Sequence, residues 1–113
     1  MTDRELLELA AKAAGMLVIG SAPKYIAQGC VEHALIVRND RGGDSVFDPL
    51  TSDGDALRLA VKLDIDVFIQ LVEGCTMASA KPEIDEIEPH GNDPYTATRR
   101  AITRAAAAIG ASK

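Results

Sequence analysis

Three aspartates stand close together in the segment "FDPLTSDGDALRLAVKLDI", residues 47–65. Carboxylate oxygens grouped around a glycine are the ligands that hard divalent cations prefer. One hypothesis is therefore a small metal-dependent enzyme that uses the Asp48/Asp53/Asp55 cluster. A calcium loop that began at Asp53 would have to close at Asp64, but the intervening residues are apolar at helical spacing, which disfavours such a loop.

The same aspartates can instead begin a helix, which we predict over residues 52–63. Thr51, Ser52 or Asp53 can accept a hydrogen bond from a free amide of the first turn. Asp55 would then lie in that turn, where the positive end of the helix dipole favours a carboxylate. We favour this capping interpretation and assign no metal ligand.

Two cysteines and two histidines are the remaining candidates for nucleophilic or acid–base chemistry. Cys30 and Cys75 fit no metal-binding spacing and no nucleophile motif, so we expect reduced structural thiols. His33 falls on the apolar face of a predicted strand and is expected to be buried. His90 lies in the polar segment "EPHGND" and is expected to be solvated. We therefore assign no catalytic residue and no cofactor.

Two charged groups near the C-terminus form a candidate interaction surface: Glu83, Asp85, Glu86 and Glu88, together with Arg99, Arg100 and Arg104. The acids are typical of a solvated edge and suit docking onto a basic partner. The arginines either bind a phosphate or pair with the acidic segment 83–88. No aromatic side chain stands among them to stack on bases, which favours the pairing.

Hydrophobic periodicity predicts the elements that position these residues. A first helix spans 2–15, with Thr2 and Glu5 at capping-box spacing and Gly15 as its stop. The last helix begins at Asp93 with Pro94 in its first turn, and Gly110 ends it. In helix 52–63 the inward-facing residues are expected to be Ala56, Leu57, Ala60, Val61 and Leu63.

Strands are predicted over 16–20, 31–38, 46–47, 65–72 and 75–80, with Glu73–Gly74 as a two-residue hairpin turn. Segments 21–30 and 39–44 are expected to be a loop and a turn, and 81–92 an acidic crossing segment. The fold class is therefore an α/β (α+β) sandwich. About three helices pack on a mostly antiparallel sheet, in a single domain that comprises residues 1–113.

Composition limits the function classes. The chain of 113 residues has a formal net charge of -5, which disfavours sequence-independent binding to nucleic acid. The N-terminus is acidic where a signal peptide is basic, and no apolar run is long enough to cross a membrane. We expect a cytoplasmic protein without a membrane association.

Segment 47–65 and the C-terminal "ATRRAITRAAAAIGASK", residues 97–113, resemble small phage and prophage proteins of the phage ABA-sandwich family. Phe47 stands where that family usually has tryptophan, and Ser52 where a second acid is common. The resemblance implies a sheet between helical layers and a phage or prophage context. It implies no activity, because most members have no assigned function.

These observations favour a non-enzymatic phage or prophage accessory protein that acts as a protein-interaction module in the bacterial cytoplasm. Its partner would be an unknown host or phage protein, and self-association through an alanine-rich helix face is a further hypothesis. The metal-dependent enzyme remains the competing class.

Overall fold

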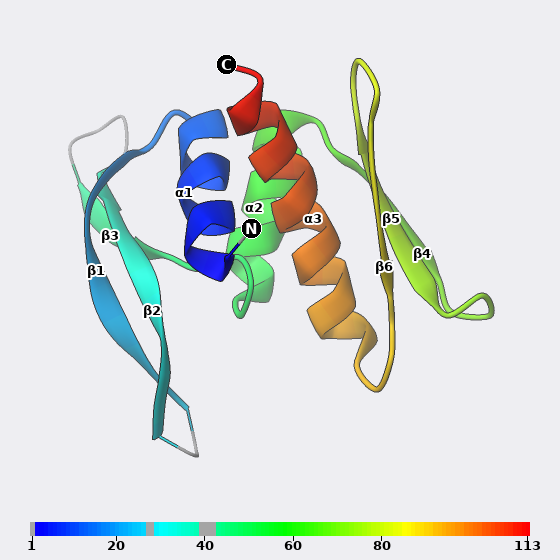
Figure 1. The fold of residues 1–113 in the computed structure, drawn as a ribbon, viewed down its shortest axis with the longest axis horizontal. Coiled ribbons are helices and arrows are strands. Elements are labelled where there is room, and N and C mark those ends of the chain that lie inside the picture. The colour runs from blue at the N-terminus through cyan, green and yellow to red at the C-terminus, as the bar shows by residue number, and fades with distance from the viewer. Residues whose placement is uncertain (1, 27–28, 39–42) are drawn as a thin grey trace.

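The computed structural model describes residues 2–26, 29–38 and 43–113, with the backbone alone over 22–26 and 29–33. Its helices form one layer between two antiparallel sheets (Figure 1). The predicted fold class, an α+β fold with three helices on antiparallel strands, is confirmed. The helices are α1 (Asp3–Ala13), α2 (Asp53–Leu63) and α3 (Pro94–Ala111).

Each sheet is a three-stranded meander. The first has the order β1-β2-β3 and packs against α1, and the second has the order β4-β5-β6 and packs against α3. The strands are β1 (Leu17–Ile26), β2 (Gly29–Arg38), β3 (Asp44–Phe47), β4 (Asp66–Gln70), β5 (Cys75–Ala80) and β6 (Ile84–Pro89).

The order of layers differs from the one that the phage resemblance implies, because the helices lie inside and the sheets outside (Figure 1). Helix α3 explains why. Its buried residues occur on most sides of the helix rather than on one stripe, because α1, α2 and the second sheet all pack against it. These residues are Ala97, Ala101, Ile102, Thr103, Ala105, Ala106, Ala107 and Gly110.

The predicted helix starts are confirmed. Thr2 caps α1 by accepting the Glu5 amide at 3.1 Å, and Asp93 caps α3 with Pro94 in the first turn. Of the three candidates for the α2 cap, Ser52 accepts the Asp55 amide at 3.2 Å. Short polar side chains at these positions satisfy amides that the helix itself leaves without a partner.

The sequence led us to expect that Gly110 ends the last helix. It is instead the penultimate residue of α3, which ends at Ala111, and it is buried. A Cβ atom at this position would be 2.0 Å from the carbonyl oxygen of Leu9 in α1. Glycine is required here because the two helix backbones approach too closely for any side chain. Lys113 adds a contact by donating to the Ala13 carbonyl at 3.1 Å.

Two segments that we expected to be irregular are strands. Residues 21–26 and 29–30 continue the β1–β2 hairpin, and Pro23 fits because β1 is an edge strand that needs no donor on its outer side. The acidic segment holds β6, which pairs with β5 throughout its length. Charged residues and proline made this segment look irregular in the sequence. Both are common on edge strands, where they prevent pairing with another chain.

The β4–β5 connection is longer than predicted. Gln70 pairs with Cys75, so residues 71–74 form the turn, and Gly74 has a φ of 73°. Most of the predicted turn at 39–44 lies outside the described residues. Within the described part, none of the helices has the length and hydropathy to cross a membrane.

Helix α2 is less enclosed than its periodicity predicts. Ala56 and Ala60 are buried as expected, and Leu59 is buried as well. In contrast, Leu57 is 64% exposed and Val61 is 74% exposed. Helix α2 packs against α3, and the second sheet does not extend over it. One apolar face of α2 is therefore left open.

We predict that Gly110→Ala destabilises the fold by at least about 2 kcal/mol, because the new methyl group overlaps the Leu9 carbonyl and the helices must separate. Urea denaturation of both proteins measures the difference. Gly54→Ala in α2 is the matched control. A Cβ there meets only the end of the Arg58 side chain, so an unchanged or slightly higher stability is expected. Equal effects at the two glycines would contradict the close packing of α1 and α3.

Candidate functional site

The aspartates of segment 47–65 hold the turn that leads into α2. The Asp48 amide donates to Oδ2 of Asp55 at 2.9 Å, and the Thr51 hydroxyl donates to the Asp48 carboxylate. The Ser52 amide donates to the Asp48 carbonyl at 2.9 Å. Asp48 is itself buried, with 2% of its surface exposed. This network explains the residue types without a cation.

Asp53 lies on the other side of the turn and pairs with Arg99 at 2.6 Å. Arg99 also donates to the Leu50 carbonyl at 2.9 Å, and its side chain is 16% exposed. The three aspartates therefore do not point at one centre. Within the described part of the chain, no group of three or more His, Cys, Asp or Glu side chains is placed to hold a metal ion.

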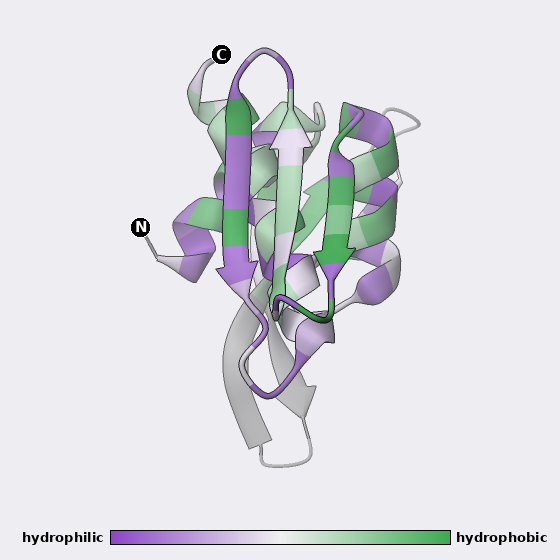
Figure 2. Ribbon diagram, turned by 90° about the vertical axis from the view of Figure 1, so that its right-hand side faces the viewer, coloured by the Kyte–Doolittle hydropathy of each residue, from purple (hydrophilic) through white to green (hydrophobic). Residues whose placement is uncertain are grey.

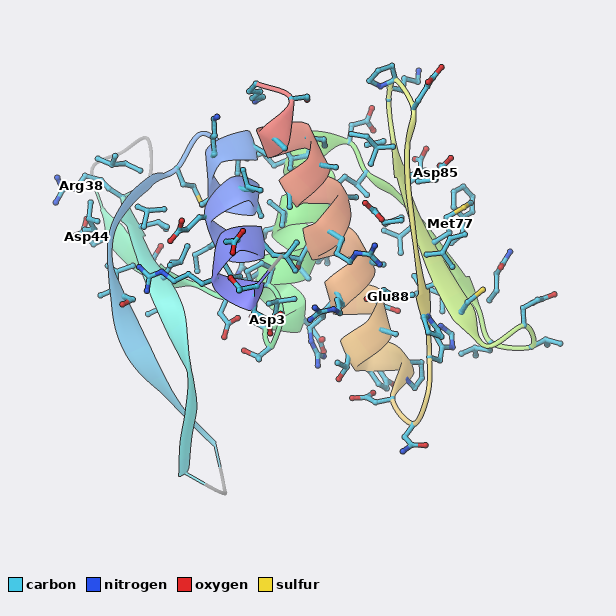
Figure 3. All side chains as sticks on the ribbon, viewed as in Figure 1. Asp3, Arg38, Asp44, Met77, Asp85 and Glu88 are labelled. Carbon is cyan, nitrogen blue, oxygen red and sulfur yellow. The ribbon has the colours of Figure 1, made fainter. Side chains whose placement is uncertain are left out.

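Four charged residues of the candidate interaction surface, Arg100, Arg104, Glu86 and Glu88, face one another between α3 and β6. Glu88 accepts from Arg100 and from Arg104, both at 3.2 Å, and Arg104 pairs with Glu86 at 3.1 Å. Arg100 also reaches Asp3 of α1 at 3.1 Å. In Figure 3, Glu88 points from β6 toward α3. The alternative in which the arginines pair with the acidic segment is the one the structure shows for Arg100 and Arg104.

Glu83 and Asp85 differ from Glu86 and Glu88, because both are exposed. Asp85 accepts the Ser79 hydroxyl at 2.6 Å on the far side of the sheet from α3 (Figure 3). Alternation along β6 puts Asp85 on the opposite face from Glu86 and Glu88, since successive strand residues point to opposite faces. Glu83 precedes β6, in the exposed turn.

The expectation that His90 is solvated is wrong. Its side chain is 9% exposed, and its Nε2 lies 2.7 Å from Oγ1 of Thr76, which lies 3.0 Å from Oγ1 of Thr98. A hydroxyl beside an imidazole resembles a nucleophile and its base. Thr76 is completely buried, however, so no substrate reaches it and the network joins β5 to α3.

Cys75 is the thiol candidate whose side chain the structure describes. Cys75 is a partly exposed free thiol whose Sγ lies 3.5 Å from Oε1 of Gln70. The side chains of Cys30 and His33 lie outside the described residues. The local sequence around His90 is polar and gave no signal of burial, because the ring's partner, Thr76, comes from β5. The His90 amide donates to the Gly74 carbonyl at 2.8 Å.

Hydrogen bonding also fixes the charge at the start of α3. The Thr96 hydroxyl donates to Asp93, and this contact holds the pKa of the Asp93 carboxyl below its usual range. Because the folded state lowers this pKa, the contribution of Asp93 to stability is present at neutral pH. It is lost as the pH falls through the pKa of the folded state.

The side of the second sheet that faces away from α3, called the outer face below, presents two neighbouring cross-strand rows. Figure 3 shows a member of each row, Met77 and Asp85, on this side. One row is apolar, and its end members Phe68 and Ile87 are 46% and 56% exposed. The other row has an acid at each end. Strand register forms the rows as Phe68–Met77–Ile87 and Asp66–Ser79–Asp85.

A groove of about 650 Å³ lies on a different side of the molecule, between α2, α3 and β4. Its walls include Leu57 of α2, Ile69 of β4 and Tyr95 of α3, each more than half exposed. The sequence pattern did not reveal it, because Leu57 and Ile69 both lie on stripes that periodicity assigns to the core.

Comparisons with protein-family models, with curated proteins and with solved structures find no match for this chain. The phage resemblance therefore rests on the quoted segments alone.

We predict that Mg²⁺, Mn²⁺ and Zn²⁺ leave the thermal midpoint of the wild type unchanged, because the Asp48–Asp55 network occupies the aspartates. Asp55→Asn should lower stability modestly, by about 1 kcal/mol, since one charge-assisted acceptor is lost. Differential scanning fluorimetry with and without each metal measures both effects. A metal-dependent rise in the wild type that Asp55→Asn abolishes would support the metal-dependent enzyme instead.

We predict that Glu88→Gln lowers the free energy of unfolding by about 1 kcal/mol, because Glu88 bridges two arginines in a partly buried position. The loss should shrink at high salt, which already screens the pairs of the wild type. Chemical denaturation at two salt concentrations tests this, with Glu83→Gln at the exposed turn as the control. An equal effect of both substitutions would contradict a bridging role for Glu88.

Proposed function

We propose that this chain is a non-enzymatic phage or prophage accessory protein that acts in the bacterial cytoplasm as a protein-interaction module. Its binding surface is the outer face of the second sheet. The partner is a protein segment that carries both apolar and basic side chains. The observation that carries this proposal is the pair of rows on the outer face, apolar beside acidic.

The apolar row supplies the area for binding. Phe68, Met77 and Ile87 are cross-strand neighbours, so their side chains form one continuous ridge across β4, β5 and β6. Exposed apolar side chains grouped in this way, with polar residues at the border, are typical of interaction sites.

The acidic row supplies the orientation. Asp66 and Asp85 are exposed on either side of Ser79, and Glu83 is exposed at the adjoining turn. Lys81 is the basic residue among the described residues that line a hollow at this end of the sheet, together with Asp64, Asp66, Glu83 and Asp85. With the net charge of -5, this surface attracts a basic partner and disfavours an acidic one.

The phage context of this proposal comes from the resemblance of segments 47–65 and 97–113 to phage proteins. We propose no reaction because of where the candidate catalytic groups lie. Asp48 and Asp55 hold a turn, the arginines are paired with acids, and Thr76 is inaccessible. These contacts account for the residues that could otherwise do chemistry.

The test is a pull-down from a lysate of the bacterial host, with and without induced prophage, followed by mass spectrometry. We expect a basic partner that the wild type retains at low salt and releases at high salt, because screening weakens exposed charge pairs. Ile87→Lys and Asp85→Lys should each lose this partner.

Leu17→Lys is the matched control, since Leu17 is 59% exposed on β1 in the other sheet. It should retain the partner. Equal retention by the wild type and by Ile87→Lys would contradict the assignment to the outer face, and no partner from either lysate would contradict the proposed function.

A further inference from the structure

The free edge of β4 has fewer of the features that protect sheet edges from pairing with another chain than the other edges have. Charged residues, prolines, bulges and short length are the usual protection. In the described backbone, three of the four sheet edges have such features. Strand β1 has Pro23 and two irregularities in register, β3 has four residues, and β6 carries three acids and Pro89.

Strand β4 is different. From Val67 to Val72 the chain reads "VFIQLV", with no charge and no proline, and Asp66 stands only at the start of the strand. Figure 2 shows the contrast within one sheet, where the ribbon of β4 is mostly hydrophobic and the ribbon of β6 mostly hydrophilic. An open, uncharged edge of this kind favours the addition of a further strand.

The apolar surface continues from this edge onto α2. Leu71 is 70% exposed and Val72 is 96% exposed beyond the end of β4, while Val61 is 74% exposed on α2. The groove with Leu57, Ile69 and Tyr95 lies between them. Each of these six residues is more than half exposed, and together they form a grouped apolar surface of the kind that protein partners cover.

The charge of the groove indicates what fills it. Its charged residues are Asp53 and Arg99, which pair with each other at 2.6 Å and so leave no net charge to attract an ionic partner. An occupant that complements this surface is therefore apolar and uncharged. The exposed residues of this same surface, Leu57 and Val61 of α2 with Leu71 and Val72 beyond β4, have this composition, so a second copy of the chain supplies such an occupant.

We infer that the chain forms a twofold symmetric homodimer in which β4 pairs antiparallel with β4 of a second copy. A twofold axis lets the same edge of both copies form the contact. When one residue of the first copy contacts a second residue of the other copy, the same two residues also meet with the copies exchanged. The second sheet of one copy and the second sheet of the other join into one continuous sheet. The two α2 helices come together beneath it. Leu57 and Val61 of each copy then cover the groove at the interface. This surface is separate from the outer face, which the dimer leaves open.

The test is analytical ultracentrifugation of the full chain over a range of concentrations, with Val61→Lys, Leu71→Lys and the control Ile87→Lys. We expect a dimer for the wild type and for Ile87→Lys. Each of the other two variants should raise the dissociation constant by at least about tenfold, because a lysine ammonium in an apolar contact loses its hydration. Circular dichroism checks that each variant is folded, which their exposed positions favour.

Hydrogen exchange tests the pairing of the strands. Amides of residues 66–70 should be protected in the wild-type dimer and exchange faster in Val61→Lys, as the concentration of dimer falls. A wild-type chain that stays monomeric up to millimolar concentration would overturn the inference. A dimer whose dissociation constant is raised by neither Val61→Lys nor Leu71→Lys would also overturn it. Either result leaves the proposed function intact, since that depends on Ile87 and Asp85.

Discussion

The close approach of α1 and α3 is the contact on which the rest of the structure depends. Gly110 lies against the Leu9 carbonyl, and alanines occupy most of the buried positions of both helices. With 4% aromatic residues and no tryptophan, the chain has few large side chains for a core. Small residues make up for the missing large side chains because they let the backbones of two helices approach each other. Dispersion contacts then come from the main chain as well as from side chains.

A central α3 determines where each charged group lies. Its three arginines reach three different neighbours: Arg99 reaches the start of α2, Arg100 reaches α1 and β6, and Arg104 reaches β6. Lysine would fit these positions less well, since the planar guanidinium donates in several directions at once. The residues that looked most like a ligand-binding cluster therefore connect the layers of the fold.

The same architecture leaves two apolar surfaces open. The second sheet is wide enough to cover α3 but ends at β4, so α2 keeps an exposed apolar face beside an uncharged sheet edge. The outer face of that sheet has no helix on it, so the Phe68–Met77–Ile87 row faces solvent. A sheet covered on one side only provides an interaction surface without any change to the core.

Local features of the structure followed from the sequence by itself. Thr2, Ser52 and Asp93 cap helices because each side chain reaches an amide only a few residues away. Fold class, too, follows from apolar periodicity, which reports how each segment is buried. Tertiary structure alone decided the rest. The burial of His90, the enclosure of Gly110 inside α3, and the exposure of Leu57 and Val61 depend on which segments meet. Periodicity marks an apolar face but not what covers it, because the covering element comes from a distant part of the chain or from another molecule.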